Sequence, residues 1–73
     1  MTPKMMRQLW AMIESTQVST LLQLDDLNLV LWLLKQFTTQ QAIDAHEASS
    51  LTTYINSRLP LIRDTAEERK SIG

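Results

Sequence analysis

The sequence predicts an all-α fold, a small bundle of three to four helices that is completed by dimerisation. One Gly and two Pro in 73 residues leave too few turn residues for a hairpin-rich β-fold. Apolar residues make up 44% of the chain and recur at helical spacing. Side chains that cap helices precede the apolar stretches. No repeat or low-complexity segment divides residues 1–73, which we interpret as one helical domain with a frayed end at about 70–73.

The first helix is predicted over residues 3–17. Thr2 can accept hydrogen bonds from free backbone N–H groups, and Pro3 suits the first helical position, where its missing N–H had no partner. The apolar residues that follow share one broad helical face, which consists of Met5, Met6, Leu9, Trp10, Met12 and Ile13.

The second helix is predicted over residues 25–37, with Asp25 as its N-cap. Residues 21–24 form either a turn that leads into it or a short helical turn. The stretch 29–34 is apolar throughout, so a buried strand is the competing interpretation. Four Leu among those six residues favour the helix.

The third helix is predicted over residues 45–58, because Asp44 and Glu47 have the spacing of a capping box. Pro60 is expected to end or kink this helix, since proline lacks the N–H that an α-helix needs. A fourth helix can restart at Pro60. The residues expected to face inward there are Leu59, Ile62 and Ala66.

Four residues are candidate structural anchors. Asp25 and Asp44 are predicted helix caps. Arg58 and Arg63 flank the expected break at Pro60, where carbonyl groups lose their partners. A guanidinium offers five donors, so either arginine can bind such carbonyls or a nearby carboxylate.

The second predicted helix is apolar around nearly its whole circumference, and such a helix must be covered on all sides. We therefore expect a homodimer or larger assembly, with Trp32 as the largest contributor to its interface. Three short neighbouring helices could also enclose the helix, so a monomer is the alternative. The candidate interface consists of Met6, Trp10, Leu29, Trp32, Leu33 and Phe37.

Nothing in the sequence predicts catalysis, a cofactor or a metal site. The chain has no Cys, one His and no glycine-rich loop. His46 is interpreted as a solvated residue of a first helical turn. Asp25 and Asp26 are adjacent, so on a helix they point about 100° apart and do not converge on one atom. We expect no enzyme.

Charge argues against a polyanion or a membrane as partner. The net charge is −1, and residues 42–57 contain no Lys or Arg. The basic residues near the C-terminus are interleaved with acidic ones, which indicates a solvated helix. The longest apolar run has six residues, whereas a membrane helix needs roughly 20. No targeting signal is visible, so we expect a cytoplasmic protein.

Four stretches, LWAMIE at 9–14, LDD at 24–26, WLL at 32–34 and YINSRLPLIRD at 54–64, resemble a small uncharacterised family of cyanobacterial proteins. The resemblance implies a bacterial cytoplasmic protein, and it implies no activity and no site residues. The function predicted from the sequence is a non-catalytic protein-interaction module that self-associates, with any other protein partner unknown. The alternative is a small nucleic-acid-binding regulator.

Overall fold

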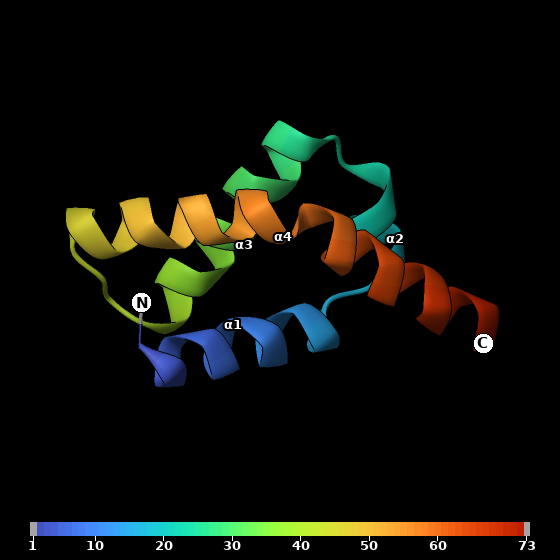
Figure 1. The fold of residues 1–73 in the computed structure, drawn as a ribbon, viewed down its shortest axis with the longest axis horizontal. Helices are drawn as coiled ribbons and strands as arrows, with labels where there is room; N and C mark the ends of the chain where they lie inside the picture. The colour runs from blue at the N-terminus through green and yellow to red at the C-terminus, as the bar shows by residue number, and fades with distance from the viewer. Residues whose placement is uncertain (1, 73) are drawn as a thin grey trace.

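Four helices follow one another in the computed structural model, which describes residues 2–72: α1 (Pro3–Ser15), α2 (Val18–Gln23), α3 (Asp26–Gln40) and α4 (Ala45–Ile72). The long α4 runs along the longest dimension of the molecule, 37 Å (Figure 1). α3 contacts both α1 and α4, and α2 packs against α4. The predicted small all-α bundle is confirmed for the described residues.

Three helices begin where a capping side chain precedes them. The backbone N–H of Met5 donates to Thr2 Oγ1 over 3.2 Å, and that of Asn28 donates to Asp25 Oδ1 over 2.8 Å. Asp44 and Glu47 each accept from the other's backbone N–H, at 2.7 and 3.1 Å. Each bond satisfies a donor that the first turn leaves free.

Helix ends differ from the prediction in three places. α1 ends at Ser15, two residues early. Residues 18–23 form a helix of their own, where we expected at most a helical turn at 21–24. α3 continues past Phe37 to Gln40, because the hydroxyls of Thr38 and Thr39 donate to carbonyl groups of the preceding turn and so fit the helix they were expected to end.

Pro60 was expected either to end or to kink the helix, and the structure shows that it does not end it, because α4 continues through this proline and no separate helix restarts there. Pro60 is exposed, so the carbonyl of Asn56, which loses its helical partner there, lies on the side open to water. Figure 1 shows that the axis of α4 changes direction along its length. The inward positions Leu59, Ile62 and Ala66 are buried as predicted. The helix includes residues 70–72, and Gly73 lies outside the described residues.

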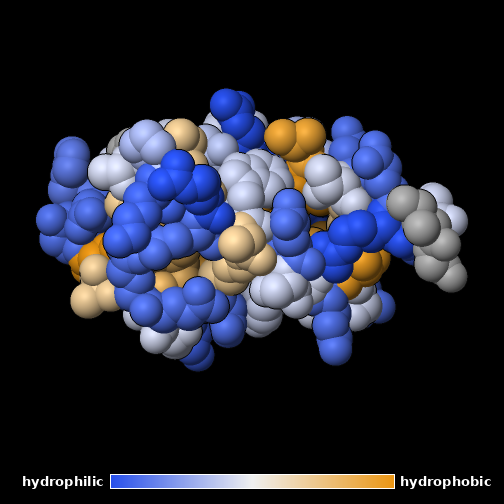
Figure 2. All heavy atoms as spheres, turned by 90° about the horizontal axis from the view of Figure 1, so that it is seen from below, coloured by the Kyte–Doolittle hydropathy of each residue, from blue (hydrophilic) through white to orange (hydrophobic). Residues whose placement is uncertain are grey.

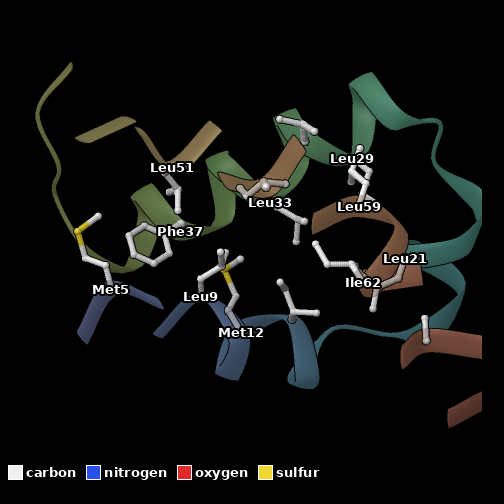
Figure 3. Packing of buried hydrophobic residues seen from close by; sticks show 14 residues of the cluster. Met5, Leu9, Met12, Leu21, Leu29, Leu33, Phe37, Leu51, Leu59 and Ile62 are labelled. Atoms are coloured by element: carbon white, nitrogen blue, oxygen red, sulfur yellow. The ribbon is translucent and has the colours of Figure 1, made fainter. Parts of the chain in front are cut away.

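A single hydrophobic core joins all four helices, and α3 supplies its centre. Figure 3 shows side chains from α1, α2 and α4 converging on those of α3. The largest of the fully buried side chains is Phe37. The core consists of Met5, Leu9, Met12, Ile13, Leu21, Leu29, Val30, Leu33, Phe37, Leu51, Ile55, Leu59, Ile62 and Ala66.

Arg63 of α4 binds the C-terminal end of α2. Its Nη1 donates to the carbonyl oxygen of Leu21 and its Nη2 to that of Leu24, both over 2.9 Å. Nη2 also contacts Asp26 Oδ1 at 2.8 Å, which forms an ion pair with the first residue of α3. One side chain therefore ties α4 to the junction between α2 and α3.

Arg69 does the same at the C-terminal end of α1, two turns further along α4. Its Nη2 donates to the carbonyl oxygen of Thr16 over 2.6 Å, and its Nη1 to that of Ile13 over 3.3 Å. Thr16 is buried, and its hydroxyl donates to the Met12 carbonyl over 2.8 Å. The carbonyl groups at the end of α1 thus accept from Ser15, Thr16 and Arg69.

Arg58 binds no carbonyl group among the described residues. Its guanidinium lies over the ring of Tyr54, 5.2 Å from the centroid, and the side chain is exposed. Because α4 does not break at Pro60, no helix end lies within its reach. Arg63 binds carbonyls and a carboxylate as expected, but the carbonyls belong to α2 instead of its own helix.

We predict that Arg63→Gln and Arg69→Gln each lower the free energy of unfolding by about 1–3 kcal/mol. Each change removes charge-assisted hydrogen bonds to carbonyls that have few other donors. In a domain of this size such a loss corresponds to roughly 4–8 °C of melting temperature for each kcal/mol. Thermal unfolding followed by circular dichroism gives the measurement.

Arg58→Gln is the matched control, since it removes the same charge from an exposed position of the same helix. We expect its melting temperature to stay close to that of the original chain. Equal losses for all three variants would show that net charge, and not carbonyl binding, is responsible.

Candidate interaction surface

Among residues 2–71, whose side chains the structure describes, three large apolar side chains are exposed: Leu27 by 69%, Leu31 by 52% and Leu61 by 48%. Leu27 and Leu31 lie four residues apart on α3, so they are neighbours on one side of that helix. Leu34 follows three residues later and is half-buried. We call Leu27, Leu31 and Leu34 the leucine face of α3.

Leu27 and Leu31 point away from the core, because the buried residues of α3 occupy its other side, and Leu34 lies at the edge of the leucine face and packs against the core. The inward side consists of Leu29, Val30, Leu33 and Phe37. Lys35 lies one turn after Leu31 and Asn28 about one turn before it, and both are exposed. The outer surface of α3 therefore combines apolar side chains with one cation.

Half of the predicted interface lies in the core of the chain itself. Leu29 and Leu33 are 0% exposed and Phe37 is 2% exposed, so none of them can contact a partner while this fold is intact. These three residues are therefore removed from the candidate interface. The chain's own helices cover this side of α3, and Leu27 and Leu31 are the residues of α3 that they leave most exposed.

Trp32 lies at the flank of α3 instead of on the leucine face. It is half-buried and packs against the core. Beside it is an open groove of about 320 Å³ between α3 and the α1–α2 connection, lined by uncharged side chains. The lining includes Met12, Ser15, Thr16, Gln17, Thr20, Trp32, Gln36 and Gln40.

Met6 and Trp10 lie on α1 and are both half-buried. The indole Nε1 of Trp10 donates to Tyr54 Oη over 2.9 Å, which ties this side chain to α4. Figure 2 shows the α1 side of the molecule, where hydrophobic atoms form separate patches among hydrophilic ones. We therefore place the candidate surface on α3 and not on α1.

The residues that could carry chemistry are separate or already engaged. His46 is exposed in the first turn of α4. Asp25 caps α3, and Asp26 pairs with Arg63. Within residues 2–72 no group of three or more His, Asp or Glu side chains is placed to hold a metal ion.

The leucine face could have been found from the sequence. Polar residues of α3 gather on the same side as Leu31, where Asn28, Lys35 and Thr38 lie within about 60° of it on a helical projection. Polar residues mark the solvent side of a helix that is otherwise apolar. This signal indicates that Leu27 and Leu31 face outward, whereas the interface predicted above treated nearly the whole circumference of the helix as apolar.

No family model, curated protein or solved structure matches the chain. The resemblance to a cyanobacterial family is therefore still a prediction. None of the helices in the described part of the chain is long and apolar enough to cross a membrane. The function has to be argued from the surface itself.

Basic side chains do not form a stripe. The guanidinium groups of Arg63 and Arg69 donate to carbonyl groups inside the bundle, so they are not free to bind phosphate. The other basic residues lie on three different helices: Lys4 and Arg7 on α1, Lys35 on α3, and Arg58 and Lys70 on α4.

We predict no binding to generic duplex DNA at physiological salt, because affinity for a duplex rises with the number of phosphates that are contacted together. A mobility-shift titration at about 0.15 M salt should show free DNA up to tens of micromolar protein. A shift at low micromolar protein that weakens as salt is raised would contradict this prediction and favour the regulator.

Proposed function

We propose that this chain is a non-catalytic protein-interaction module that self-associates through the leucine face of α3. The observation that carries the proposal is the exposure of Leu27 and Leu31 side by side on a helix whose opposite side is the centre of the core. Adjacent exposed leucines cost hydration free energy in a monomer and are covered when two copies meet.

Chain length supports the same proposal. A 73-residue chain without Cys can bury only a modest core and has no disulfide to stabilise it. Binding to a second copy adds buried apolar area that the single chain lacks, and it stabilises the folded state by mass action. Two-fold symmetric pairs are the commonest form of such assembly.

The module is proposed to act in the bacterial cytoplasm, in keeping with the resemblance noted above. Among the described residues of α3, Lys35 is the charge that shares the side of the leucines, so the surface suits an apolar partner with an acidic group. A second copy of α3 meets this description, because it brings three leucines and the exposed carboxylate of Asp25.

We expect the chain to be a dimer at tens of micromolar and to dissociate on dilution, and the double variant Leu27→Gln, Leu31→Gln to stay monomeric. The variant removes four partly exposed leucines from each dimer, which should raise the dissociation constant about 100-fold or more. Size exclusion with light scattering over a dilution series measures this constant. The mass to follow is 8.4 kDa for a single chain.

Leu61→Gln is the control variant. Leu61 is exposed to nearly the same degree as Leu31, but it lies on α4 among the polar residues Ser57, Arg58 and Asp64. We expect its dissociation constant to equal that of the original chain. An original chain that elutes as a monomer at all concentrations would refute self-association.

A further inference from the structure

The leucine face can meet a second copy in two orientations, and only one of them also places opposite charges together. We infer that the two α3 helices of the dimer run antiparallel, with Leu31 of one copy against Leu31 of the other at the two-fold axis. This inference rests on the proposed self-association, and it specifies the contact through which self-association occurs.

The spacing of the leucines permits this arrangement. Leu27 lies four residues before Leu31, and Leu34 lies three residues after it. With a rise of 1.5 Å per residue, antiparallel helices centred on Leu31 bring each Leu27 within about 1.5 Å, along the axis, of the level of the partner's Leu34. All three leucines of each copy then lie against leucines of the other.

A parallel pair would also bring leucines together, so charge decides between the two orientations. In a parallel pair Lys35 lies level with Lys35 of the other copy, and Asp25 lies level with Asp25 of the other copy. In the antiparallel pair Lys35 comes within about 3 Å, along the axis, of the level of Asp25, the exposed N-cap of the other α3. Like charges at one level repel, and opposite charges attract and set the orientation.

Asp25 can accept this lysine. It uses Oδ1 to cap α3 and is exposed, so its other carboxylate oxygen can accept a second cation. A lysine side chain is long and flexible enough to reach it from a neighbouring helix. Asp26 lies about 140° around α3 from Leu31, on the side where it pairs with Arg63, and is not part of this contact.

The size of the surface sets the expected affinity. A stable interface of standard size buries about 800 Å² on each partner, roughly a sixth of the 4752 Å² that this chain exposes. Three leucines and their flanking residues on one helix cover less than that. The dimer therefore belongs to the weaker class of interfaces, with a dissociation constant in the micromolar range.

Disulfide trapping tests the orientation, and the chain suits it because it contains no Cys of its own. Four single variants of the full chain are needed: Leu31→Cys, Leu27→Cys, Leu34→Cys and, as a collision control on α4, Leu61→Cys. Circular dichroism of each reduced variant checks the fold, and light scattering checks the dimer. Mild oxidation at tens of micromolar protein and a non-reducing gel then measure the cross-linked fraction.

We expect Leu31→Cys to cross-link several times faster than Leu61→Cys. Leu27→Cys alone and Leu34→Cys alone should stay uncross-linked, because the two cysteines of such a dimer lie about 9–12 Å apart along the axis, beyond the roughly 7 Å limit between Cα atoms. An equimolar mixture of these two variants should cross-link efficiently.

Three results would overturn the inference. Self-cross-linking of Leu27→Cys and Leu34→Cys as fast as that of Leu31→Cys would indicate parallel helices. A dimer by light scattering in which none of the α3 variants cross-links above the control would place the contact on another surface and leave self-association intact. A monomer at every concentration would refute both the orientation and the proposed function.

Discussion

The bundle depends on two arginines of α4 that bind the ends of other helices. A helix end leaves carbonyl groups without partners, and a glycine in left-handed conformation commonly resolves this. Here no residue between 2 and 72 has a positive φ, and α1 and α2 end in extended residues. Arg63 and Arg69 supply the missing donors. Since both belong to α4, the bonds to the carbonyls of Thr16, Leu21 and Leu24 form only when α4 is docked. The carbonyls of Met12 and Ile13 also accept from Ser15 and Thr16.

This dependence explains how a helix as short as α2 can exist. Six residues are too few for a helix that is stable on its own in water. α2 is held by the burial of Leu21 and by the two bonds from Arg63 to its C-terminal end. Pro60 lies between the half of α4 that starts at Ala45 and the half that carries both arginines, so the bend there sets the direction from which they approach α2 and α1.

Features that depend on neighbouring residues could be predicted from the sequence. Thr2, Asp25 and the Asp44–Glu47 pair mark three helix starts, because a cap acts on the turn that follows it. Pro60 was expected to end or to kink the helix, and its local effect alone could not decide between the two. A proline disfavours a helix locally, but the packing of Leu59, Ile62 and Ala66 on both sides of it outweighs that cost.

Contacts between residues that lie far apart in the sequence were not predicted. Arg69 has no local signal, since its acceptors lie 53 and 56 residues away along the chain. Arg63 was identified as a carbonyl-binding residue, but periodicity alone could not tell which helix end it reaches. In the apolar α3, the spacing shows which residues share a side and not which side faces the core. Leu29, Leu33 and Phe37 were assigned to the surface for that reason.

α3 has two sides that differ in burial, and in the proposed dimer this would separate folding from association. Its inward side is buried by the chain's own helices, so a polar substitution there disrupts the core. Leu27 and Leu31 contribute little to the core, and polar residues in their place would suit a monomer at least as well. The exposed positions of α1 show the difference, because Lys4, Arg7 and Glu14 are charged where α3 has leucines. This contrast between the two helices is the reason for which we propose a partner on this side of α3.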